Sequence, residues 1–440
     1  MIAKILIANR SEAAVRIIRA CREMGIKTVA VFSEAERDSL HVALADESVC
    51  VGGAYSGDSY LNMERIVSAA IATGAVGIHP GCGFLSENAD FARLCEAQDL
   101  LFIGPDSECI RSLGEKSRAR EIAASAGVPT VPGTGVIKSE EEALKFATEI
   151  GYPVLVKASL GGGGKGIRRA NDAESLRGAF SAASGEAKKA FGCADVYIEK
   201  YLTHIRHIEV QLLADNYGKI ITLGERDCSL QKNNQKVIEE TPCPAISDRL
   251  RSSLKDAAIA VAREAGYKNA GTVEFLVDEK ENFYFIEMNT RLQVEHGVTE
   301  EISGIDIVKW QIRIAAQIPL PDEFEHVALQ GASIECRINA GESGKIDFLH
   351  APSGVRIHFD SALFSGSTVL PYYDSMLGKL VVWAPNRAEA IRRMNSALCE
   401  TAITGIATNI DELLHVISSR EFVDGNYDTA FYSEYIKGIK

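Results

Sequence analysis

The sequence predicts a multidomain protein that combines an α/β unit with α+β units. Its 440 residues correspond to about three domains at roughly 150 residues each. Short apolar runs alternate with helical patterns over the first hundred residues, and from about residue 205 strands come first with helices between them. An apolar fraction of 46% with 24% charged residues excludes a disordered chain, a collagen-like repeat and a disulfide-stapled miniprotein.

The first hundred residues predict a parallel sheet with helices on its faces, because strands and helices alternate there. The predicted strands cover 4–8, 28–32, 48–51, 75–78 and 100–103, and the predicted helices cover 12–24, 60–73 and 87–98. An open α/β sheet binds ligands at the carboxyl ends of its strands. The turns at 9–11 and 79–83 are therefore candidate ligand positions.

A helical pattern over 107–127 leads into a compact α+β module. The module is predicted to contain a helix at 140–150, strands at 153–158, 166–169 and 196–200, and a helix at 173–190. These patterns divide the chain into an N-terminal domain (1–114), a helical linker (115–130), the module (131–204) and a C-terminal part (205–440).

The net charge of −13 disfavours partners with many phosphates. Nucleic acid and anionic membrane surfaces repel such a chain, so an anionic substrate would need a local basic pocket. No apolar run approaches the ~20 residues of a membrane helix. The ten cysteines include no CxxC pair and are expected to be reduced thiols, which favours a cytoplasmic protein.

A glycine run at 161–164, followed by Lys165 and Gly166, comes directly after the strand that carries Lys157. Consecutive glycines are costly in conformational entropy, and they let backbone N–H groups approach a phosphate. The loop lacks the Walker A spacing. A phosphate-binding loop is the favoured interpretation, and a flexible hairpin tip is the alternative.

The runs 271–277 and 283–289 flank a polar turn and predict a hairpin. If the hairpin is symmetric about 280–281, Glu274 lies opposite Glu287. Two opposed carboxylates repel each other unless a cation lies between them. Together with Asn289 they suit Mg²⁺ or Mn²⁺, whereas solvated glutamates on an exposed face fit poorly beside such aromatic strands.

Arg291, Gln293 and Glu295 recur at period two after this hairpin. If the strand continues, they line one side as an anion pocket with a base beside it, although such a pattern by itself is more often a surface strand. Other polar residues near strand-like segments carry little weight singly: Glu199, Lys200, His207, Gln231, Lys236 and Arg337. Cys228 is interpreted as a core cysteine.

Several blocks, in this order, resemble biotin carboxylase, an ATP-grasp enzyme and a component of acetyl-CoA carboxylase in fatty acid biosynthesis and of related carboxylases. The blocks are 7–10 (IANR), 79–81 (HPG), 83–88 (GFLSEN), the glycine run, 199–202 (EKYL), 287–291 (EMNTR), 293–296 (QVEH) and 371–376 (PYYDSM). The resemblance implies a Rossmann-like pre-ATP-grasp domain, an ATP-grasp lid and core, and a C-terminal biotin carboxylase domain.

The resemblance also implies an activity. ATP and bicarbonate would form carboxyphosphate, which carboxylates biotin on a separate carrier protein, and a separate carboxyltransferase would use the product. ATP, biotin and two Mg²⁺ or Mn²⁺ ions would be needed, and a homodimer is expected by analogy. No Met is followed by Lys in the chain, so the biotin-attachment tetrapeptide is absent.

The resemblance assigns the site residues by type of ligand. ATP is assigned to Lys116, Lys157, Gly163 and Gly164 (phosphates), Glu199, Lys200, Tyr201 and Leu202 (adenine side), His207 and Gln231 (ribose), and Asn234. The metal ligands are Glu274, Glu287 and Asn289, and Glu274 and Glu287 also belong to the nucleotide site. Bicarbonate is assigned to Lys236, Arg291, Gln293, Val294 and the base Glu295, and biotin to Cys82, Gly83 and Arg337.

The chain departs from the family pattern at several positions. Ser11 replaces a glycine and is expected to be tolerated at φ < 0, and Cys82 replaces a tyrosine that would wall the biotin pocket. Asn233 and Asn234 stand in a stretch that is normally basic, and Gly297 replaces a proline and is expected to loosen a strand end. The segment after Ala340 also looks shortened.

Two alternatives remain open from the sequence. Cys82 makes an ATP-grasp ligase with a different nitrogen acceptor conceivable, and Asn234 makes a nucleotide-binding subunit without turnover conceivable. ADP release that depends on biotin would separate the favoured interpretation from both.

Overall fold

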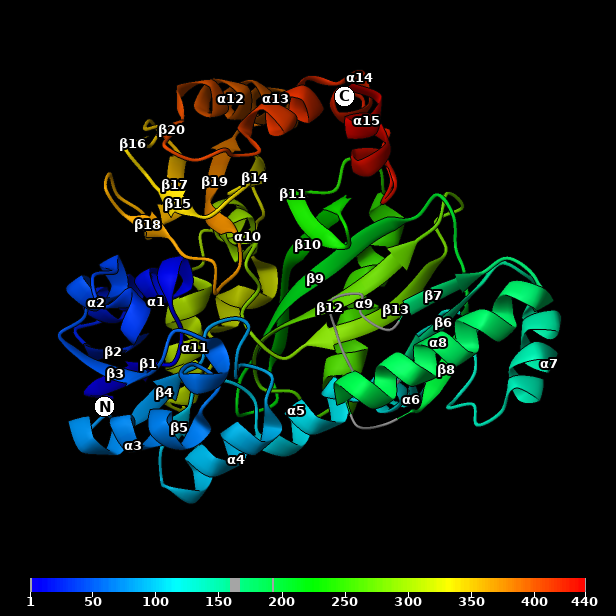
Figure 1. The fold of residues 1–440 in the computed structure, drawn as a ribbon, viewed down its shortest axis with the longest axis horizontal. Helices are drawn as coiled ribbons and strands as arrows, with labels where there is room; N and C mark the ends of the chain where they lie inside the picture. Colours follow the sequence, from blue (N-terminus) through cyan, green and yellow to red (C-terminus); the bar gives the residue numbers. More distant parts are fainter. Residues whose placement is uncertain (1, 159–166, 192–193, 440) are drawn as a thin grey trace.

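The computed structural model describes residues 2–158, 167–191 and 194–439. Figure 1 shows an N-terminal α/β layer, a small outlying α+β module and a large sheet that carries the C-terminal helices. The multidomain α/β and α+β architecture is the one that the sequence predicts.

The N-terminal sheet is parallel and has the strand order β3-β2-β1-β4-β5. Its strands are β1 (Lys4–Ile7), β2 (Lys27–Ser33), β3 (Glu47–Gly52), β4 (Gly77–His79) and β5 (Leu101–Phe102). Helices α1 (Ser11–Glu23), α2 (Leu40–Leu44), α3 (Met63–Thr73) and α4 (Ala89–Ala97) connect them, with short 3₁₀ turns at Glu34–Glu36 and Ser56–Asp58. The central strand β1 is buried on both faces, as its continuous apolar run requires.

Two local expectations in this region are wrong. Ser11 has a φ of +51°, so the turn after β1 holds a non-glycine residue in the left-handed region. The helix expected over 107–127 is broken into α5 (Ser107–Gly114) and α6 (Lys116–Ser125), because Glu115 is extended. The break places Lys116 at the first residue of α6.

The small module contains an antiparallel sheet of order β7-β6-β8. Its strands are β6 (Val154–Ala158), β7 (Ile167–Ala170) and β8 (Val196–Lys200), and helices α7 (Glu140–Ile150) and α8 (Ala173–Phe191) pack on them. The glycine run, including Gly163 and Gly164, lies outside the described residues.

The large sheet has eight strands in the order β13-β12-β9-β10-β11-β14-β19-β17. They are β9 (Arg206–Ala214), β10 (Ile220–Lys232), β11 (Gln235–Thr241), β12 (Asn269–Val277), β13 (Phe283–Asn289), β14 (Ala332–Asn339), β17 (Ile357–Ser361) and β19 (Met376–Ala384). All neighbouring pairs in this sheet are antiparallel.

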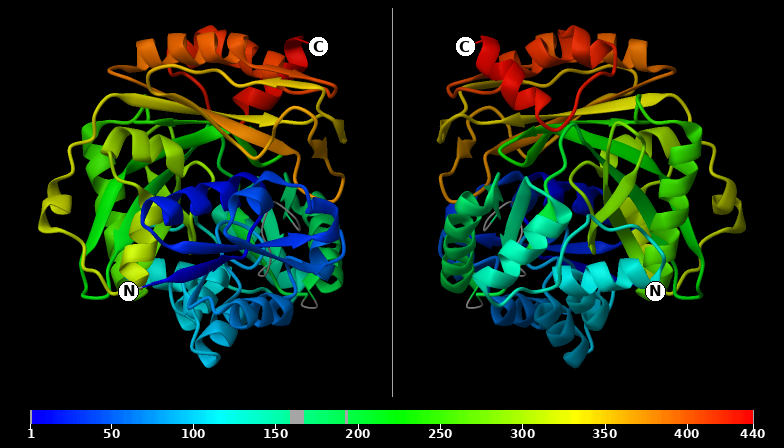
Figure 2. Two further views of the ribbon diagram at one scale, coloured as in Figure 1. Left: turned by 90° about the vertical axis from the view of Figure 1, so that its left-hand side faces the viewer. Right: turned by 90° about the vertical axis from the view of Figure 1, so that its right-hand side faces the viewer.

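Helices pack on both faces of this sheet. They are α9 (Asp248–Glu264), α10 (His296–Ser303), α11 (Ile307–Ala315), α12 (Arg387–Glu400), α13 (Ile410–Ser418), α14 (Arg420–Val423) and α15 (Phe431–Ile439), with a 3₁₀ turn at Asp322–His326. Two small ribbons complete the fold: β15 (Gly344–Lys345) with β18 (Thr368–Val369), and β16 (Phe348–His350) with β20 (Ala402–Thr404). Figure 2 shows the C-terminal helices lying along one side of the sheet, remote from the N-terminal layer.

The strand expected to continue through 290–295 is not formed. Strand β13 ends at Asn289, residues 290–295 form an irregular segment, and α10 begins at His296. Gly297 therefore lies in the first turn of a helix, and the expectation that it loosens a strand end is wrong.

Candidate active site

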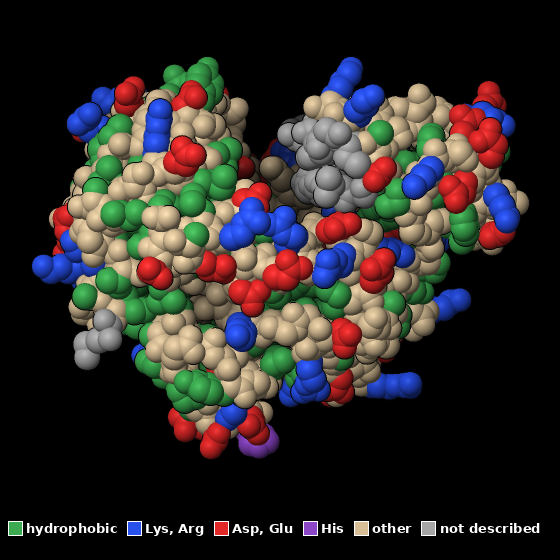
Figure 3. All heavy atoms as spheres, turned by 90° about the horizontal axis from the view of Figure 1, so that it is seen from below, with side chains coloured by type: hydrophobic (Ala, Val, Ile, Leu, Met, Phe, Trp, Pro, Cys, Tyr) green, Lys and Arg blue, Asp and Glu red, His purple; other side chains and the backbone are tan. Residues whose placement is uncertain are grey.

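A cavity of about 1100 Å³ lies where the three parts of the chain meet. The space-filling view shows the molecule hollowed between two lobes, with acidic and basic side chains interspersed over the surrounding face (Figure 3). The walls of the cavity include most of the predicted site residues: Cys82, Gly83, Lys116, Lys157, His207, Gln231, Asn234, Lys236, Glu274, Glu287, Asn289, Arg291, Gln293, Val294, Glu295 and Arg337.

The hairpin of β12 and β13 places Glu274 directly opposite Glu287, as the sequence predicts. Near the turn, however, Phe275 pairs with Phe285, so Ile286 is an extra residue in a β-bulge. Without this bulge Glu287 would pair with Val273 on the core face. The pairing continues across the sheet, where Glu274 faces Glu209 on β9 and Glu209 faces Arg226 on β10.

The ammonium group of Lys236 on β11 joins three carboxylates of this site. Its Nζ lies 2.6 Å from Glu209 Oε2, 3.0 Å from Glu274 Oε1 and 2.6 Å from Glu295 Oε1. A lysine ammonium has three N–H donors, and all three are used here. Any anion that binds Lys236 must therefore take over at least one of these contacts.

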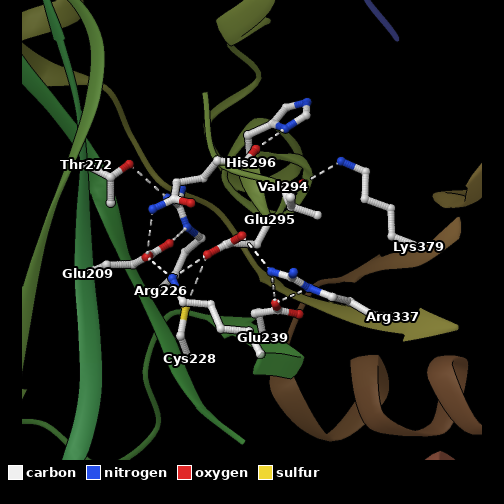
Figure 4. Close-up of polar contacts among 12 residues, drawn as sticks. Glu209, Arg226, Cys228, Glu239, Thr272, Val294, Glu295, His296, Arg337 and Lys379 are labelled. Atoms are coloured by element: carbon white, nitrogen blue, oxygen red, sulfur yellow. Dashed lines mark hydrogen bonds and ion pairs between the residues drawn. The ribbon is translucent and has the colours of Figure 1, made fainter. Parts of the chain in front are cut away.

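Glu295 is buried and lies between two cations, of which Figure 4 labels Arg337. Its Oε1 accepts from Lys236, and its Oε2 lies 2.7 Å from Arg337 Nη2. Burial alone would raise the pKa of Glu295, but Lys236 and Arg337 hold that pKa well below its usual range. Glu295 is therefore ionised and able to accept a proton.

Arg337 is held in turn by a second buried glutamate. Its Nε donates to Glu239 Oε1 at 2.6 Å. Burial raises the pKa of Glu239, and the charge of Arg337 offsets only part of this effect. The resulting pKa is about 7. The orientation of Arg337 therefore depends on two carboxylates with very different pKa values.

The two opposed carboxylates, Glu274 and Glu287, have pKa values that are shifted in opposite directions. Burial opposes the charge on Glu274, but Lys236 and His207 hold its pKa well below the usual range. Burial and the charge of Glu274 raise the pKa of Glu287, and Lys116 Nζ lies 3.9 Å from Glu287 Oε2. Like charges so arranged favour a cation between them.

The donor set fits a hard divalent cation. Glu274 and Glu287 offer carboxylate oxygens and Asn289 offers an amide oxygen, which are the ligand types that Mg²⁺ and Mn²⁺ prefer. The donor atoms of His207, Glu209 and Glu274 also lie within 4.8 Å of one another, but Lys236 contacts both glutamates of that group, whereas among the described residues its ion pairs include only Glu274 from the first set. The first set is therefore the better metal site.

The irregular segment 290–295 still brings its side chains together, although it is not a strand. Arg291 Nη1 donates to Gln293 Oε1 at 2.7 Å and its Nη2 to Asn289 Oδ1 at 3.0 Å, while Glu87 Oε2 accepts from Arg291 Nε at 3.0 Å. A guanidinium, an amide and Val294 thus line one part of the cavity, which suits an oxyanion.

The side predicted for the ribose contains a short polar chain. His207 Nε2 lies 2.7 Å from Glu274 Oε2, and Gln231 Nε2 donates to His207 Nδ1 at 2.8 Å. Burial lowers the pKa of His207, but Glu274 more than offsets this, so the net shift is upward. Asn233 and Asn234 both have positive φ and form the tight turn between β10 and β11.

The predicted adenine segment lies beside the cavity and does not line it. Glu199 is ion-paired with Arg120 and with Lys157, which was predicted to bind phosphate. The Lys200 ammonium donates to the carbonyl groups of Gly151 and Tyr152, each at 3.0 Å. The ring of Tyr201 lies under Arg169, and Leu202 is half-buried. The nucleotide roles of Glu199, Lys200, Tyr201 and Leu202 therefore stay predictions.

Sequence reasoning missed several charged residues of the site. They are Glu87, Arg120, Glu209, Arg226 and Glu239. The side chain of Arg226 is fully buried, where it donates to Glu209, Gln211 and Thr299. Strand alternation could have found Glu209, which is two residues after His207, but nothing local marks Glu239 as a partner of Arg337.

Two further findings concern the helices and the cysteines. In the part of the chain that the structure describes, no helix combines the length and apolar character needed to cross a bilayer. The nine cysteines within the described ranges are all free thiols.

Three family models together match most of the chain. The N-terminal domain of biotin carboxylase matches residues 1–110, the ATP-binding domain of the carbamoyl-phosphate synthase L chain matches 115–323, and the biotin carboxylase C-terminal domain matches 335–434.

Known proteins give the same result over the full length. Biotin carboxylase 1 of Bacillus subtilis is 51% identical over 445 residues, which cover 99% of each chain. The biotin carboxylase domain dimer of Hydrogenobacter thermophilus 2-oxoglutarate carboxylase, solved with MgADP, ADP and bicarbonate, is 48% identical with a TM-score of 0.97 and covers 100% of this chain and 99% of that one. Biotin carboxylase of Campylobacter jejuni, solved as a β-γ-ATP complex, is 45% identical with a TM-score of 0.96 and covers 99% of both chains. The chain therefore belongs to the biotin carboxylase family and is an ATP- and bicarbonate-dependent carboxylase of biotin.

Proposed function

We propose that the cavity carries out the first half-reaction of a biotin-dependent carboxylase on biotin borne by a separate carrier protein. One observation carries this proposal: Glu295 is held between Lys236 and Arg337, in the same cavity as the opposed pair Glu274 and Glu287. This arrangement puts a base beside an anion pocket and next to a site for a nucleotide-bound cation.

Glu274, Glu287 and Asn289 would hold the Mg²⁺ or Mn²⁺ ions that accompany ATP. These ions would neutralise part of the negative charge of the phosphates. Lys116 lies near Glu287 and is therefore placed to contact the same phosphates. Lys157 would have to leave Glu199, at least in part, to reach them.

Bicarbonate would bind Arg291, Gln293, the Val294 amide and Lys236. Its negative charge, and the contact that it takes from Lys236, would raise the pKa of Glu295 and so help Glu295 to accept the bicarbonate proton. The deprotonated oxygen then attacks the γ-phosphorus of ATP. A new P–O bond forms and the bond to ADP breaks, which gives carboxyphosphate.

Carboxyphosphate would then release CO₂ and phosphate inside the cavity. The phosphate takes the N1 proton of biotin, and N1 attacks CO₂ to form the C–N bond. Arg337 would face the ureido oxygen and stabilise the negative charge that develops there. A guanidinium that is already oriented by Glu239 and Glu295 needs little reorganisation for this role.

We further propose a cytoplasmic homodimer that passes carboxybiotin to a separate carboxyltransferase, as in acetyl-CoA carboxylase of fatty acid biosynthesis. The nine free cysteines support a reducing compartment. The related Hydrogenobacter thermophilus domain is a dimer in its solved structure, which supports the same assembly here.

The experiment is ADP formation from ATP, Mg²⁺ and bicarbonate, measured with and without free biotin. We expect ADP release that requires bicarbonate and increases with biotin. ADP release that does not change with biotin but increases with another amide or amine would indicate a ligase with a different acceptor. ATP binding without ADP release would indicate a nucleotide-binding subunit without turnover.

A further inference from the structure

The segment 290–295 carries proposed ligand-binding groups although it has no regular secondary structure. It carries four of the proposed bicarbonate contacts, yet it belongs to neither β13 nor α10. Buried backbone groups outside regular structure need partners from elsewhere in the chain. Two buried side chains supply them at the carbonyl groups of Gln293 and Val294.

His296 holds the first carbonyl. Its Nδ1 lies 2.7 Å from the oxygen of Gln293, and the ring is nearly fully buried. In a trans peptide the C=O and N–H groups point in opposite directions. Fixing the Gln293 carbonyl therefore also fixes the direction of the Val294 N–H, which is the group proposed to bind bicarbonate.

Lys379 holds the second carbonyl. Its Nζ donates to the Val294 oxygen at 2.5 Å (Figure 4). The lysine is 0% exposed and is not among the residues that line the cavity. In the sheet register, Lys379 on β19 lies directly opposite Arg337 on β14. Two neighbouring strands thus hold successive groups of the segment, since Arg337 contacts the Glu295 side chain and Lys379 contacts the Val294 carbonyl.

The surroundings of Lys379 indicate that its position is specific. Glu12 Oε1 lies 3.3 Å from Nζ, and Glu335 is a second buried carboxylate whose charge acts on this lysine. Neither Glu335 oxygen has a hydrogen-bond partner among the residues that the structure describes. A buried ammonium that only needed charge compensation would pair closely with such a carboxylate, but Lys379 makes its shortest contact with a backbone carbonyl.

We propose that His296 and Lys379 are positioning residues that clamp the two peptide units on either side of Val294, and so set the direction of the bicarbonate-binding amide and of Glu295. This inference rests on the proposed function for the identity of the ligand. The clamp itself does not depend on that function, because it is a property of the ligand-free backbone.

The test compares Lys379→Met with Lys379→Arg. Methionine fills the space of the lysine without a donor, whereas arginine keeps one. We expect Lys379→Met to raise the KM for bicarbonate at least tenfold and to leave the KM for ATP within about twofold, and we expect Lys379→Arg to recover most of the loss. Leu380→Ala is the matched control, because it truncates a buried side chain on the opposite face of the same strand.

Hydrogen exchange of the ligand-free protein gives a second readout, independent of turnover. Amides of 290–296 should exchange at least tenfold faster in Lys379→Met than in the wild type, with no such change in β1. If Lys379→Met does not fold, His296→Phe and the double variant Lys379→Met/Glu335→Gln are judged by the same criteria. An unchanged bicarbonate KM together with unchanged exchange would overturn the clamp, whereas a wild type without bicarbonate-dependent turnover would overturn only the proposed function.

Discussion

Glu295 is buried between Lys236 and Arg337, so its ionised form is strongly favoured. Glu295→Gln keeps the shape and an acceptor oxygen but cannot take a proton. We expect the rate of bicarbonate-dependent ADP release to fall by a factor of about 10²–10⁴, the usual contribution of a general base. Glu264→Gln, an exposed glutamate on α9, is the control, and a fall of less than threefold in Glu295→Gln would argue against a base at this position.

Glu239 should make stability depend on pH. Its pKa rises from 4.5 in the unfolded chain to about 7 in the folded protein, so the folded protein binds more protons between these values. The stability that this group contributes is present below pH 4.5 and is lost as the pH rises to about 7. At roughly 1.4 kcal/mol per pKa unit, the total change is about 3 kcal/mol.

Glu239→Gln should therefore flatten the pH dependence of the unfolding midpoint. The measurement is thermal unfolding at pH 5 and pH 8 for the wild type and the variant, with exposed Glu279→Gln as the control. Equal differences between the two pH values in all three proteins would contradict the raised pKa.

Cys82 lines the cavity at a position where the resemblance to biotin carboxylase implies a tyrosine. The carbonyl of Cys82 accepts from Asn9 Nδ2 at 2.8 Å, so the backbone is held independently of the side chain. Cys82→Tyr should add an aromatic wall and lower the KM for free biotin by about two- to tenfold. Cys50→Tyr, at an exposed position, should leave that KM unchanged, and no change in Cys82→Tyr would contradict the hypothesis.

At the scale of elements, Gly297 lowers the stability of α10 relative to alanine at the same position. The residue has ordinary helical backbone, and a methyl group there would lie 3.5 Å from Glu335 Oε2 and from Val381 Cγ2, which is ordinary contact. Gly297→Ala should therefore stabilise the protein by about 0.5–1 kcal/mol.

Chemical unfolding of Gly297→Ala and Gly74→Ala provides the comparison. Gly74 ends α3 with a φ of +68° and nothing within 4 Å of its added methyl, so alanine there meets only conformational strain. We expect Gly74→Ala to destabilise the protein. Destabilisation of both variants would show that the first turn of α10 cannot accept a side chain.

The hairpin of β12 and β13 illustrates what the sequence could and could not predict. The opposition of Glu274 and Glu287 followed from run lengths and turn position, and the structure has this pair. The bulge at Ile286 that makes it possible has no signal in the sequence, since neither glycine nor a break in the apolar pattern marks it. The turn is centred on residue 280 and not between 280 and 281, and the bulge shifts the pairing by one residue. These two departures from the assumed symmetry cancel, so the predicted pair is correct.

The segment 290–295 shows a different limit. Alternating polar residues predicted that these side chains line one pocket, and in the structure Arg291 donates to Gln293. The period-two pattern suggested a strand, but a tertiary contact from Lys379 and a local contact from His296 hold an irregular backbone instead. Contacts between residues 85 positions apart cannot be inferred from local pattern, and the same holds for Arg337 with Glu239.

At the scale of the whole molecule, Tyr373 ties the cavity wall to the N-terminal sheet. Its ring lies 4.1 Å from Arg10 Cζ, and its hydroxyl lies 2.6 Å from both Ser33 Oγ and the Ala54 carbonyl. Tyr373→Phe keeps the ring but removes both hydrogen bonds. We expect a loss of about 1–2 kcal/mol in unfolding free energy and faster hydrogen exchange over 52–59.

Tyr372→Phe is the matched control, because that tyrosine lies on the same loop and is more than one-third exposed. Equal effects of the two variants would mean that the loop as a whole, and not the contact of Tyr373, joins the two parts.

The row formed by Glu287, Glu274, Glu209 and Arg226 runs straight across four adjacent strands. On β9 the neighbours of Glu209 alternate in kind, with polar His207 and Gln211 on its face and apolar Ile208 and Val210 on the other. Inserting or deleting a single codon inside any of these strands would exchange the two sets and drive carboxylates into the helix-packed interior. Length variation among related chains should therefore accumulate in the turns between these strands, and their lengths should stay fixed even where individual side chains change.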